Sequence, residues 1–177
     1  MEIEDEEIDL RKYIRAIPDY PKKGIIFRDI TPMLSDASAF KRCIEELSNK
    51  AEKLKPDYIV GIDARGFIMG SAVAYALGLG FVPARKKGKL PYKAISEEYQ
   101  LEYGNAALEM HEDSFPKGSK IVIIDDLLAT GGTAGAAGKL VGRLGGLIEG
   151  YLFVVEISEL AGRALLGDDK VTSILKF

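Results

Sequence analysis

The chain has 177 residues, with 24 Lys and Arg against 27 Asp and Glu, which gives a net charge of −3. This length suits one domain with a substantial core, and the 47% of hydrophobic residues exclude a largely disordered chain. The negative charge argues against a protein that coats nucleic acid, and no apolar run approaches the roughly 18 residues that predict a membrane span. A single cysteine, Cys43, and a single histidine, His111, exclude a disulfide framework and the usual kinds of zinc site.

The first residues, MEIEDEEIDL, are acidic and resemble neither a signal peptide nor a transit peptide, so we expect a cytoplasmic protein. Apolar residues recur at nearly helical spacing over residues 8–17 and predict a helix that Pro18 ends. Residues 24–27 are expected to be extended and residues 29–32 to form a turn. A second helix, capped by Ser35 or Asp36, is expected to reach about residue 54.

A repeated rhythm begins at residue 58. Short apolar strands are predicted at residues 58–62, 80–85, 120–124, 151–155 and 171–176, with helices at residues 67–77 and 133–144 between them. This alternation predicts an α/β fold within one domain, residues 1–177, in which helices cover both faces of a twisted parallel sheet. Residues 86–100 are polar and lack a core pattern, which is typical of a functional or mobile loop.

The third of these strands runs directly into two acids and a glycine-rich turn. Asp125 and Asp126 then lie at the carboxyl end of a parallel strand, where α/β proteins bind ligands. Backbone amides and hydroxyls at the start of the next helix suit a phosphate, and two acids suit vicinal hydroxyls. The turn comprises Ala129, Thr130, Gly131, Gly132 and Thr133. The pattern predicts a sugar phosphate site, against the alternative of a plain strand-to-helix connection.

Three other segments carry candidate chemistry. The sequence GIDARG at residues 61–66 ends a strand and offers amides and Arg65 for a second anion, unless Arg65 only pairs with Asp63. Residues 85–89, RKKGK, place four positive charges around one glycine and are either an anion-binding cluster or a solvated face. Residues 24–32 contain an apolar run beside Arg28 that could cover a flat ring or simply cap the core.

The segment VIIDDLLATGGT resembles the phosphoribosyl diphosphate (PRPP) binding motif of type I phosphoribosyltransferases, and LLATGGT is similar to the members that use adenine. GIIFRDITPML, GIDARGFIMG, RKKGKLP and LEYG resemble other segments of these enzymes in the same order. The resemblance covers residues 17–160. It implies an N-terminal segment, residues 1–34, that forms a base-binding hood, and a mobile catalytic loop, residues 86–104.

The resemblance also implies the reaction, which is transfer of the phosphoribosyl group from PRPP to adenine to give AMP and pyrophosphate. Asp125 and Asp126 would hold the ribose hydroxyls, and residues 129–133 the 5′-phosphate. The pyrophosphate would lie on the loop that contains Asp63, Ala64 and Arg65. Mg²⁺ is the implied cofactor, held mostly by substrate oxygens and water and not by direct protein ligands.

The remaining implied roles concern the base and the loop that closes over it. Backbone groups of Ile26 and Arg28 would contact the adenine edge, while Phe27 and Leu127 would stack on its faces. Glu102 would handle a purine proton and Tyr103 would line the closed site. The loop cations would be Arg85, Lys86 and Lys89, and Arg85 would reach the neighbouring subunit of a homodimer.

Two alternatives to this reaction remain open at the level of sequence. One is the same chemistry on hypoxanthine, xanthine or orotate, because base identity would be set near residues 26–28. The other is a regulator that kept the PRPP site without catalysis. Such regulators usually carry a DNA-binding segment, and neither end of this chain is long or basic enough for one, so we expect neither nucleic acid nor membrane as a partner.

Overall fold

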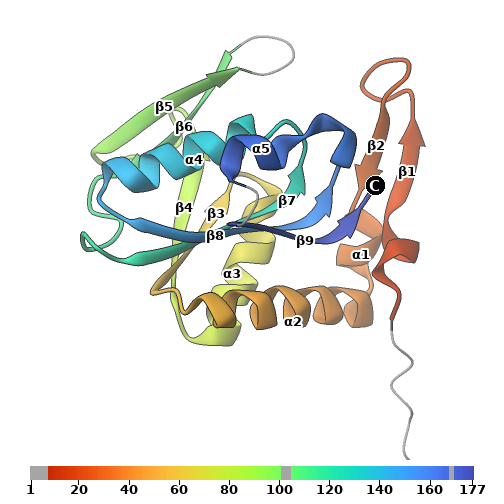
Figure 1. The fold of residues 1–177 in the computed structure, drawn as a ribbon, viewed down its shortest axis with the longest axis horizontal. Coiled ribbons are helices and arrows are strands. Elements are labelled where there is room, and N and C mark those ends of the chain that lie inside the picture. The colour runs from red at the N-terminus through yellow and green to blue at the C-terminus, as the bar shows by residue number, and fades with distance from the viewer. Residues whose placement is uncertain (1–7, 101–104, 168–169) are drawn as a thin grey trace, which may run out of the picture. The chain divides into compact units, whose positions relative to one another are not determined.

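The structure, a computed structural model, describes residues 8–100, 105–167 and 170–177. It divides the chain into two compact units, Met1–Glu46 and Leu47–Phe177, which are described separately below. Figure 1 shows the elements of both units.

The N-terminal unit contains a short 3₁₀ helix, η1 (Leu10–Tyr13), and two antiparallel strands, β1 (Arg15–Pro18) and β2 (Ile26–Asp29). The helix predicted over residues 8–17 is therefore wrong beyond its first turn. A run this short before a proline cannot form a stable helix alone, and its apolar residues also fit a strand. Strand pairing, which places Ile17 opposite Phe27, decides between the two.

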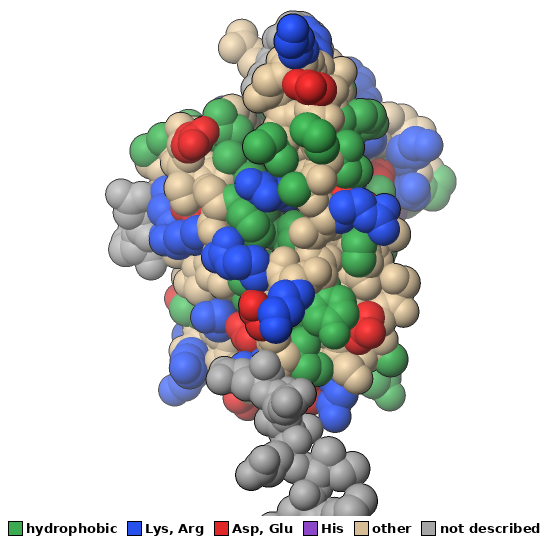
Figure 2. All heavy atoms as spheres, turned by 90° about the vertical axis from the view of Figure 1, so that its right-hand side faces the viewer, with side chains coloured by type: hydrophobic (Ala, Val, Ile, Leu, Met, Phe, Trp, Pro, Cys, Tyr) green, Lys and Arg blue, Asp and Glu red, His purple; other side chains and the backbone are tan. Residues whose placement is uncertain are grey.

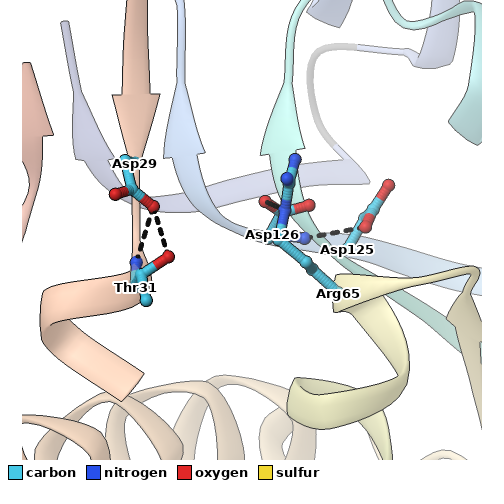
Figure 3. A network of polar contacts seen from close by, with 5 residues as sticks. All are labelled: Asp29, Thr31, Arg65, Asp125 and Asp126. Carbon is cyan, nitrogen blue, oxygen red and sulfur yellow. Dashed lines mark hydrogen bonds and ion pairs between the residues drawn. The ribbon is translucent and has the colours of Figure 1, made fainter. Parts of the chain in front are cut away.

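Two short-range caps shape the rest of this unit. The predicted turn at residues 29–32 is in fact the entry to helix α1 (Thr31–Ser35), because Asp29 accepts hydrogen bonds from the Thr31 backbone N–H at 2.9 Å and its hydroxyl at 2.5 Å (Figure 3). Asp36 caps helix α2 (Ala37–Leu54) through the Ala39 N–H, as one of the two predicted caps. Cys43 is fully buried on α2, and this burial, reinforced by Glu46, raises the pKa of its thiol to about 12.

The second unit is built on a seven-stranded sheet with the order β5-β6-β4-β3-β7-β8-β9. Five strands are parallel neighbours, and β5 and β6 add an antiparallel hairpin at one edge. The strands are β3 (Tyr58–Ile62), β4 (Gly80–Lys86), β5 (Ala94–Gln100), β6 (Asn105–His111), β7 (Lys120–Leu128), β8 (Leu147–Glu156) and β9 (Val171–Lys176).

The helices confirm the predicted α/β class. Helix α3 (Arg65–Leu77) packs on β3, β4 and β7, whereas α4 (Gly132–Arg143) packs on β5 to β8, and Figure 1 shows the two on opposite faces of the sheet. A 3₁₀ turn, η2 (Ser158–Leu160), and the short helix α5 (Gly162–Leu166) follow β8. The shared core is apolar, with Val60, Ile62, Ile121 and Ile123 at or below 1% exposure.

The expectation that residues 86–100 lack regular structure is wrong. Residues 94–100 form β5, which pairs along its full length with β6. The hairpin has only a weak hydrophobic pattern in the sequence, because β5 buries no residue fully and only Leu108 and Met110 of β6 reach the core. Strand β7 also runs four residues beyond its predicted end, so both predicted acids lie within the strand, where Asp125 is opposite Phe153 of β8.

Among the described residues, no helix combines the length and the apolar character needed to cross a membrane. The face drawn in Figure 2 carries lysine and arginine side chains interspersed with hydrophobic and acidic ones. This face is thus chemically mixed, as is normal for the surface of a folded chain.

Candidate active site

A cavity of about 790 Å³ opens within the second unit where β3 and β7 end at their carboxyl edges. This is the position at which open α/β sheets bind ligands. The structure brings twelve of the predicted site residues to this one cavity: Asp63, Ala64, Arg65, Lys86, Asp125, Asp126, Leu127, Ala129, Thr130, Gly131, Gly132 and Thr133.

One of the two acids that line the cavity is paired with an arginine. Arg65 extends from the start of α3 to Asp126 on β7, and its Nε lies 2.5 Å from Asp126 Oδ2 (Figure 3). The Asp126 side chain is 7% exposed, whereas that of Arg65 is 45% exposed. The arginine therefore neutralises a buried carboxylate while its own side chain stays partly exposed at the cavity wall.

Asp125 lies beside this pair in a different environment. Its Oδ1 accepts a hydrogen bond from the Asp126 backbone N–H at 2.9 Å. Burial raises its pKa well above the usual value of 3.8, the Asp126 charge raises it further, and Arg65 opposes the rise. A methyl group placed on Gly66 would lie 2.7 Å from this carboxylate, so the glycine is what lets α3 begin against it.

The loop between β3 and α3 is the more highly charged of two loops that border the cavity. Asp63 Oδ2 accepts a hydrogen bond from the Lys86 backbone N–H at 3.3 Å and lies 3.9 Å from Arg85 Nε. The peptide bond that joins Asp63 to Ala64 is cis. This loop thus presents one arginine and neighbouring lysines, and it suits a multiply charged anion.

The second loop, residues 129–133 between β7 and α4, offers main-chain groups. Gly131 has φ 85°, the left-handed conformation that glycine adopts most readily, and it immediately precedes α4. Within the described part of the chain, no side chain caps this helix. The N–H groups of the first turn of α4, together with the helix dipole, suit the binding of a phosphate.

Several predicted residues are elsewhere. Arg85 and Lys89 do not line the cavity, and Arg85 instead donates from Nη1 to the Lys89 carbonyl oxygen at 3.2 Å. Glu102 and Tyr103 lie outside the described residues. The predicted base-binding residues of the N-terminal unit are all on β2: Ile26, which is 52% exposed, and the half-buried Phe27 and Arg28, with Phe27 in edge contact with Tyr20 at 5.3 Å.

Some cavity residues were not among the predicted site residues. Glu98, Tyr99 and Asn105 line the cavity from the hairpin of β5 and β6, and Lys87 lines it beside Lys86. Lys87 belongs to the positive cluster at residues 85–89, and Glu98 and Tyr99 belong to the polar stretch at residues 86–100. The alternation around Leu108 and Met110 is a further signal, because it indicates a strand that a partner strand can pair with.

The donor set at the cavity is suited to a hard cation. The described residues contain no cluster of three or more His, Cys, Asp or Glu side chains that could hold a metal alone. Asp125 and Asp126 nevertheless supply carboxylate oxygens beside the turn. A Mg²⁺ ion that keeps water and substrate oxygens as most of its ligands fits such a site.

Known proteins resemble this chain in sequence and in fold. The phosphoribosyl transferase domain family matches residues 32–157. Adenine phosphoribosyltransferase of Thermosipho africanus (strain TCF52B) is 54% identical over 168 residues, which are 95% of this chain and 99% of the relative. The crystal structure of adenine phosphoribosyltransferase from Thermoanaerobacter pseudethanolicus is similar to this chain with a TM-score of 0.91 at 50% sequence identity. The match covers 95% of this chain and 98% of the crystallised chain.

The same enzyme from Saccharomyces cerevisiae was crystallised with D-2,5-dideoxy-2,5-imino-altritol 1,6-bisphosphate and adenine. It has a TM-score of 0.88 at 39% identity and covers 94% of this chain and 96% of its own. Family match, sequence identity and structural similarity agree over nearly the full length. The chain therefore belongs to the phosphoribosyltransferase family, within its group of adenine phosphoribosyltransferases.

Proposed function

We propose that this chain transfers the 5-phosphoribosyl group from PRPP to adenine and releases AMP and pyrophosphate. The observation that carries the proposal is one cavity bordered by two anion-binding loops of different kinds, with an acid pair between them. A substrate with a phosphate at one end, two vicinal hydroxyls and a diphosphate at the other matches that order of groups. Membership of the adenine-using group supports the choice of base.

Each part of PRPP is assigned to residues of the second unit. The turn at residues 129–133 binds the 5′-phosphate through backbone N–H groups and the Thr130 and Thr133 hydroxyls. Asp125 and Asp126 accept hydrogen bonds from the ribose hydroxyls. Arg65, with the amides of its loop, binds the pyrophosphate, and Lys86 and Lys87 add positive charge at the cavity wall.

The reaction follows a dissociative course. The bond from the anomeric carbon to pyrophosphate breaks, and the leaving electron pair goes to an oxygen that Arg65 stabilises. The ribose ring then carries positive charge next to the carboxylates, which stabilise it electrostatically. A purine nitrogen attacks the opposite face of that carbon, and Glu102 takes the ring proton.

Mg²⁺ is the proposed cofactor, since it neutralises the diphosphate and so makes it a better leaving group. Asp125 and Asp126 are the residues that would hold it, mostly through water and substrate hydroxyls. A cation there would also favour the ionised form of Asp125, whose pKa is raised in the ligand-free chain.

Part of the recognition of the base is assigned to the N-terminal unit. Backbone groups of Ile26 and Arg28 would contact the edge of the base, and Phe27 would stack on one of its faces. Ile26 is a large apolar side chain that is 52% exposed, which is consistent with a surface that a flat ring covers. Arg85, Lys89 and Tyr103 are proposed to act when the loop closes.

A homodimer is proposed for the same enzyme, in the cytoplasm. Tyr75 and Ile68, seven residues apart on one side of α3, are 90% and 41% exposed, although α3 is apolar around much of its circumference. A second copy of the chain would cover this face. Light scattering should give the mass of a dimer, and Tyr75→Glu should shift it towards the monomer.

The enzymatic proposal is tested by incubating the purified chain with PRPP, Mg²⁺ and single bases and measuring nucleotide by chromatography. AMP should form from adenine far faster than a nucleotide forms from hypoxanthine, xanthine or orotate. Activity with hypoxanthine and none with adenine would refute the choice of base. Binding of PRPP without any transfer would instead support a regulator.

A further inference from the structure

Behind the turn at residues 129–133 lies a buried ionic network that the proposed reaction does not use. Glu156, at the end of β8, is 5% exposed. Its Oε1 accepts a hydrogen bond from Arg163 Nε at 2.7 Å, and its Oε2 accepts one from Arg163 Nη2 at 2.9 Å. The Ser173 hydroxyl donates to Glu156 Oε2 at 2.6 Å, and Arg163 Nη1 donates to the Val171 carbonyl oxygen at 2.7 Å. The network thus joins β8, β9 and α5.

The helix that this network holds is not stable by itself. Helix α5 has five residues, Gly162–Leu166, far fewer than an isolated helix needs. It follows Ala161, whose φ of 51° is left-handed and unfavourable for a residue with a Cβ atom. Local propensity therefore works against α5, so its position depends on tertiary contacts. The bidentate pair of Arg163 with Glu156 is one of them, and charge-assisted pairs of this kind are strong.

The first residue of α5 lies directly against the turn. A Cβ atom added to Gly131 would lie 2.7 Å from the Gly162 carbonyl oxygen. A Cβ atom added to Gly162 would overlap the Ala129 carbonyl oxygen and lie 3.0 Å from the Gly131 nitrogen. Two glycines thus allow the backbone of α5 and the backbone of the turn to touch. A shift of α5 towards the turn would therefore press on its backbone at Ala129 and Gly131.

We propose that Arg163, Glu156 and Gly162 are positioning residues that hold the turn in its phosphate-binding geometry through α5. They act without touching the substrate. The inference rests on the proposed function, because it takes the turn as the site of the 5′-phosphate. It predicts a selective defect, in which recognition of the 5′-phosphate by the turn weakens while recognition of pyrophosphate by the loop of Asp63, Ala64 and Arg65 is unaffected.

A matched pair of glycine substitutions tests the contact itself. Gly162→Ala places a methyl group against the turn, whereas Gly142→Ala, on α4, places one where no atom lies within 4 Å. We expect Gly162→Ala to raise the KM for AMP in the reverse reaction about tenfold or more, since small displacements of binding groups are costly. The KM for pyrophosphate should stay within about twofold, and Gly142→Ala should change neither value.

The ionic network is tested in the same assay with Arg163→Ala, Arg163→Lys and Glu156→Gln. Lysine keeps the charge but cannot form the bidentate pair, so its KM for AMP should lie between those of the wild type and Arg163→Ala. Arg42→Ala is the control, because it removes another Arg–Glu pair, the one with Glu46 on α2. Titrations with AMP and adenosine add a second readout, and the preference for AMP should shrink in the Arg163 variants.

The outcomes separate the two proposals. If the wild type forms no PRPP from AMP and pyrophosphate, the proposed function fails. If the wild type is active but the variants raise both KM values by the same factor, or neither, the positioning role is wrong. Should Arg163→Ala fail to fold, as judged by its melting curve, Arg163→Lys and Gly162→Ala decide the question alone.

Discussion

Two loops at the same edge of the sheet border the cavity and differ in what they offer to an anion. The turn between β7 and α4 offers backbone amides, set by the left-handed Gly131 and by α5 behind it. The loop between β3 and α3 offers Arg65 and neighbouring charged side chains. The geometry of a main-chain anion site is fixed by backbone packing. The affinity of a site made of charged side chains depends instead on how those side chains are paired, and salt weakens it. If the two loops bind the two ends of one substrate, as proposed, the two ends are recognised by different kinds of interaction.

An ion pair links the charged loop to the strand that precedes the turn. Arg65 belongs to the charged loop, and its partner Asp126 belongs to the strand that leads into the main-chain turn. Asp125 has no such cation at hydrogen-bond distance in the described structure and instead lies under Gly66. Neighbouring acids of the same type thus have separable roles, and substitutions can distinguish them.

The largest expected effect comes from the acids. Asp125→Asn and Asp126→Asn should each lower kcat by about 100-fold or more, because each removes charge from the side of the developing ribose cation. Only Asp126→Asn should also raise the KM for pyrophosphate, since it releases Arg65. Steady-state kinetics in both directions measure this. Unchanged turnover in both variants would remove the acid pair from the mechanism.

A smaller effect is expected from Arg65→Lys. Lysine retains the charge but loses the planar set of donors that can serve Asp126 and a diphosphate together. We expect the KM for pyrophosphate to rise about tenfold, and the KM for AMP to change by less than about twofold. Equal changes in both constants would show that the loops do not act separately. Lys120→Ala, at the opposite end of β7, is the control for the loss of a surface charge.

The main-chain turn was predictable from sequence, because a buried strand followed by acids and adjacent glycines has few other structural uses. The charged loop was predictable for the same reason, at the end of the neighbouring strand. By contrast, β5, which contributes Glu98 and Tyr99 to the cavity, was not predicted as a strand, because its sequence lacks a clear apolar alternation. Its conformation is set by pairing with β6, which is a property of the partner and not of its own residues.

The pairing of Arg163 with Glu156 could not be predicted from the sequence either. Nothing in the spacing of residues 156 and 163 indicates a pair, because η2 and the left-handed Ala161 separate them. The predicted helix at residues 8–17 failed for a related reason, since a short apolar run fits both periods. Local sequence patterns predicted most of the residues that the structure brings to the cavity, whereas the ionic network of Arg163 and Glu156 depends on pairing between residues of different elements.

A modest effect on stability should accompany the loss of activity in Asp125→Asn. The raised pKa of Asp125 means that the folded chain binds this proton more tightly than the unfolded chain, so stability falls as pH rises from about 3.8 through the folded pKa. At pH 7 the variant should therefore melt about 2–4 °C higher, the shift that about 1 kcal/mol produces at this chain length.

The pH dependence of melting checks the sign. The advantage of Asp125→Asn should disappear in acid, below pH 3.8, where the wild-type carboxyl is protonated in both states. Glu156→Gln should instead lower the melting temperature at pH 7, because hydrogen bonds from Arg163 lower the pKa of the wild-type Glu156 below 4.5. The ionised Glu156 stabilises the fold above that pH, and this contribution is lost as pH falls through the folded pKa. A lower melting temperature for Asp125→Asn at pH 7 would contradict the assignment.

The smallest expected effect concerns salt and addresses the comparison most directly. Lys87 is exposed at the cavity wall near the charged loop and contributes by long-range attraction, which ions screen. Between about 50 and 300 mM KCl, over which the screening length falls roughly 2.4-fold, the KM for pyrophosphate should rise more steeply than the KM for AMP. Lys87→Ala should reduce the slope for pyrophosphate, by about twofold over this range, and leave the slope for AMP unchanged. Parallel slopes in wild type and variant would mean that both loops recognise their anions by the same screened charge, and the distinction between them would fall.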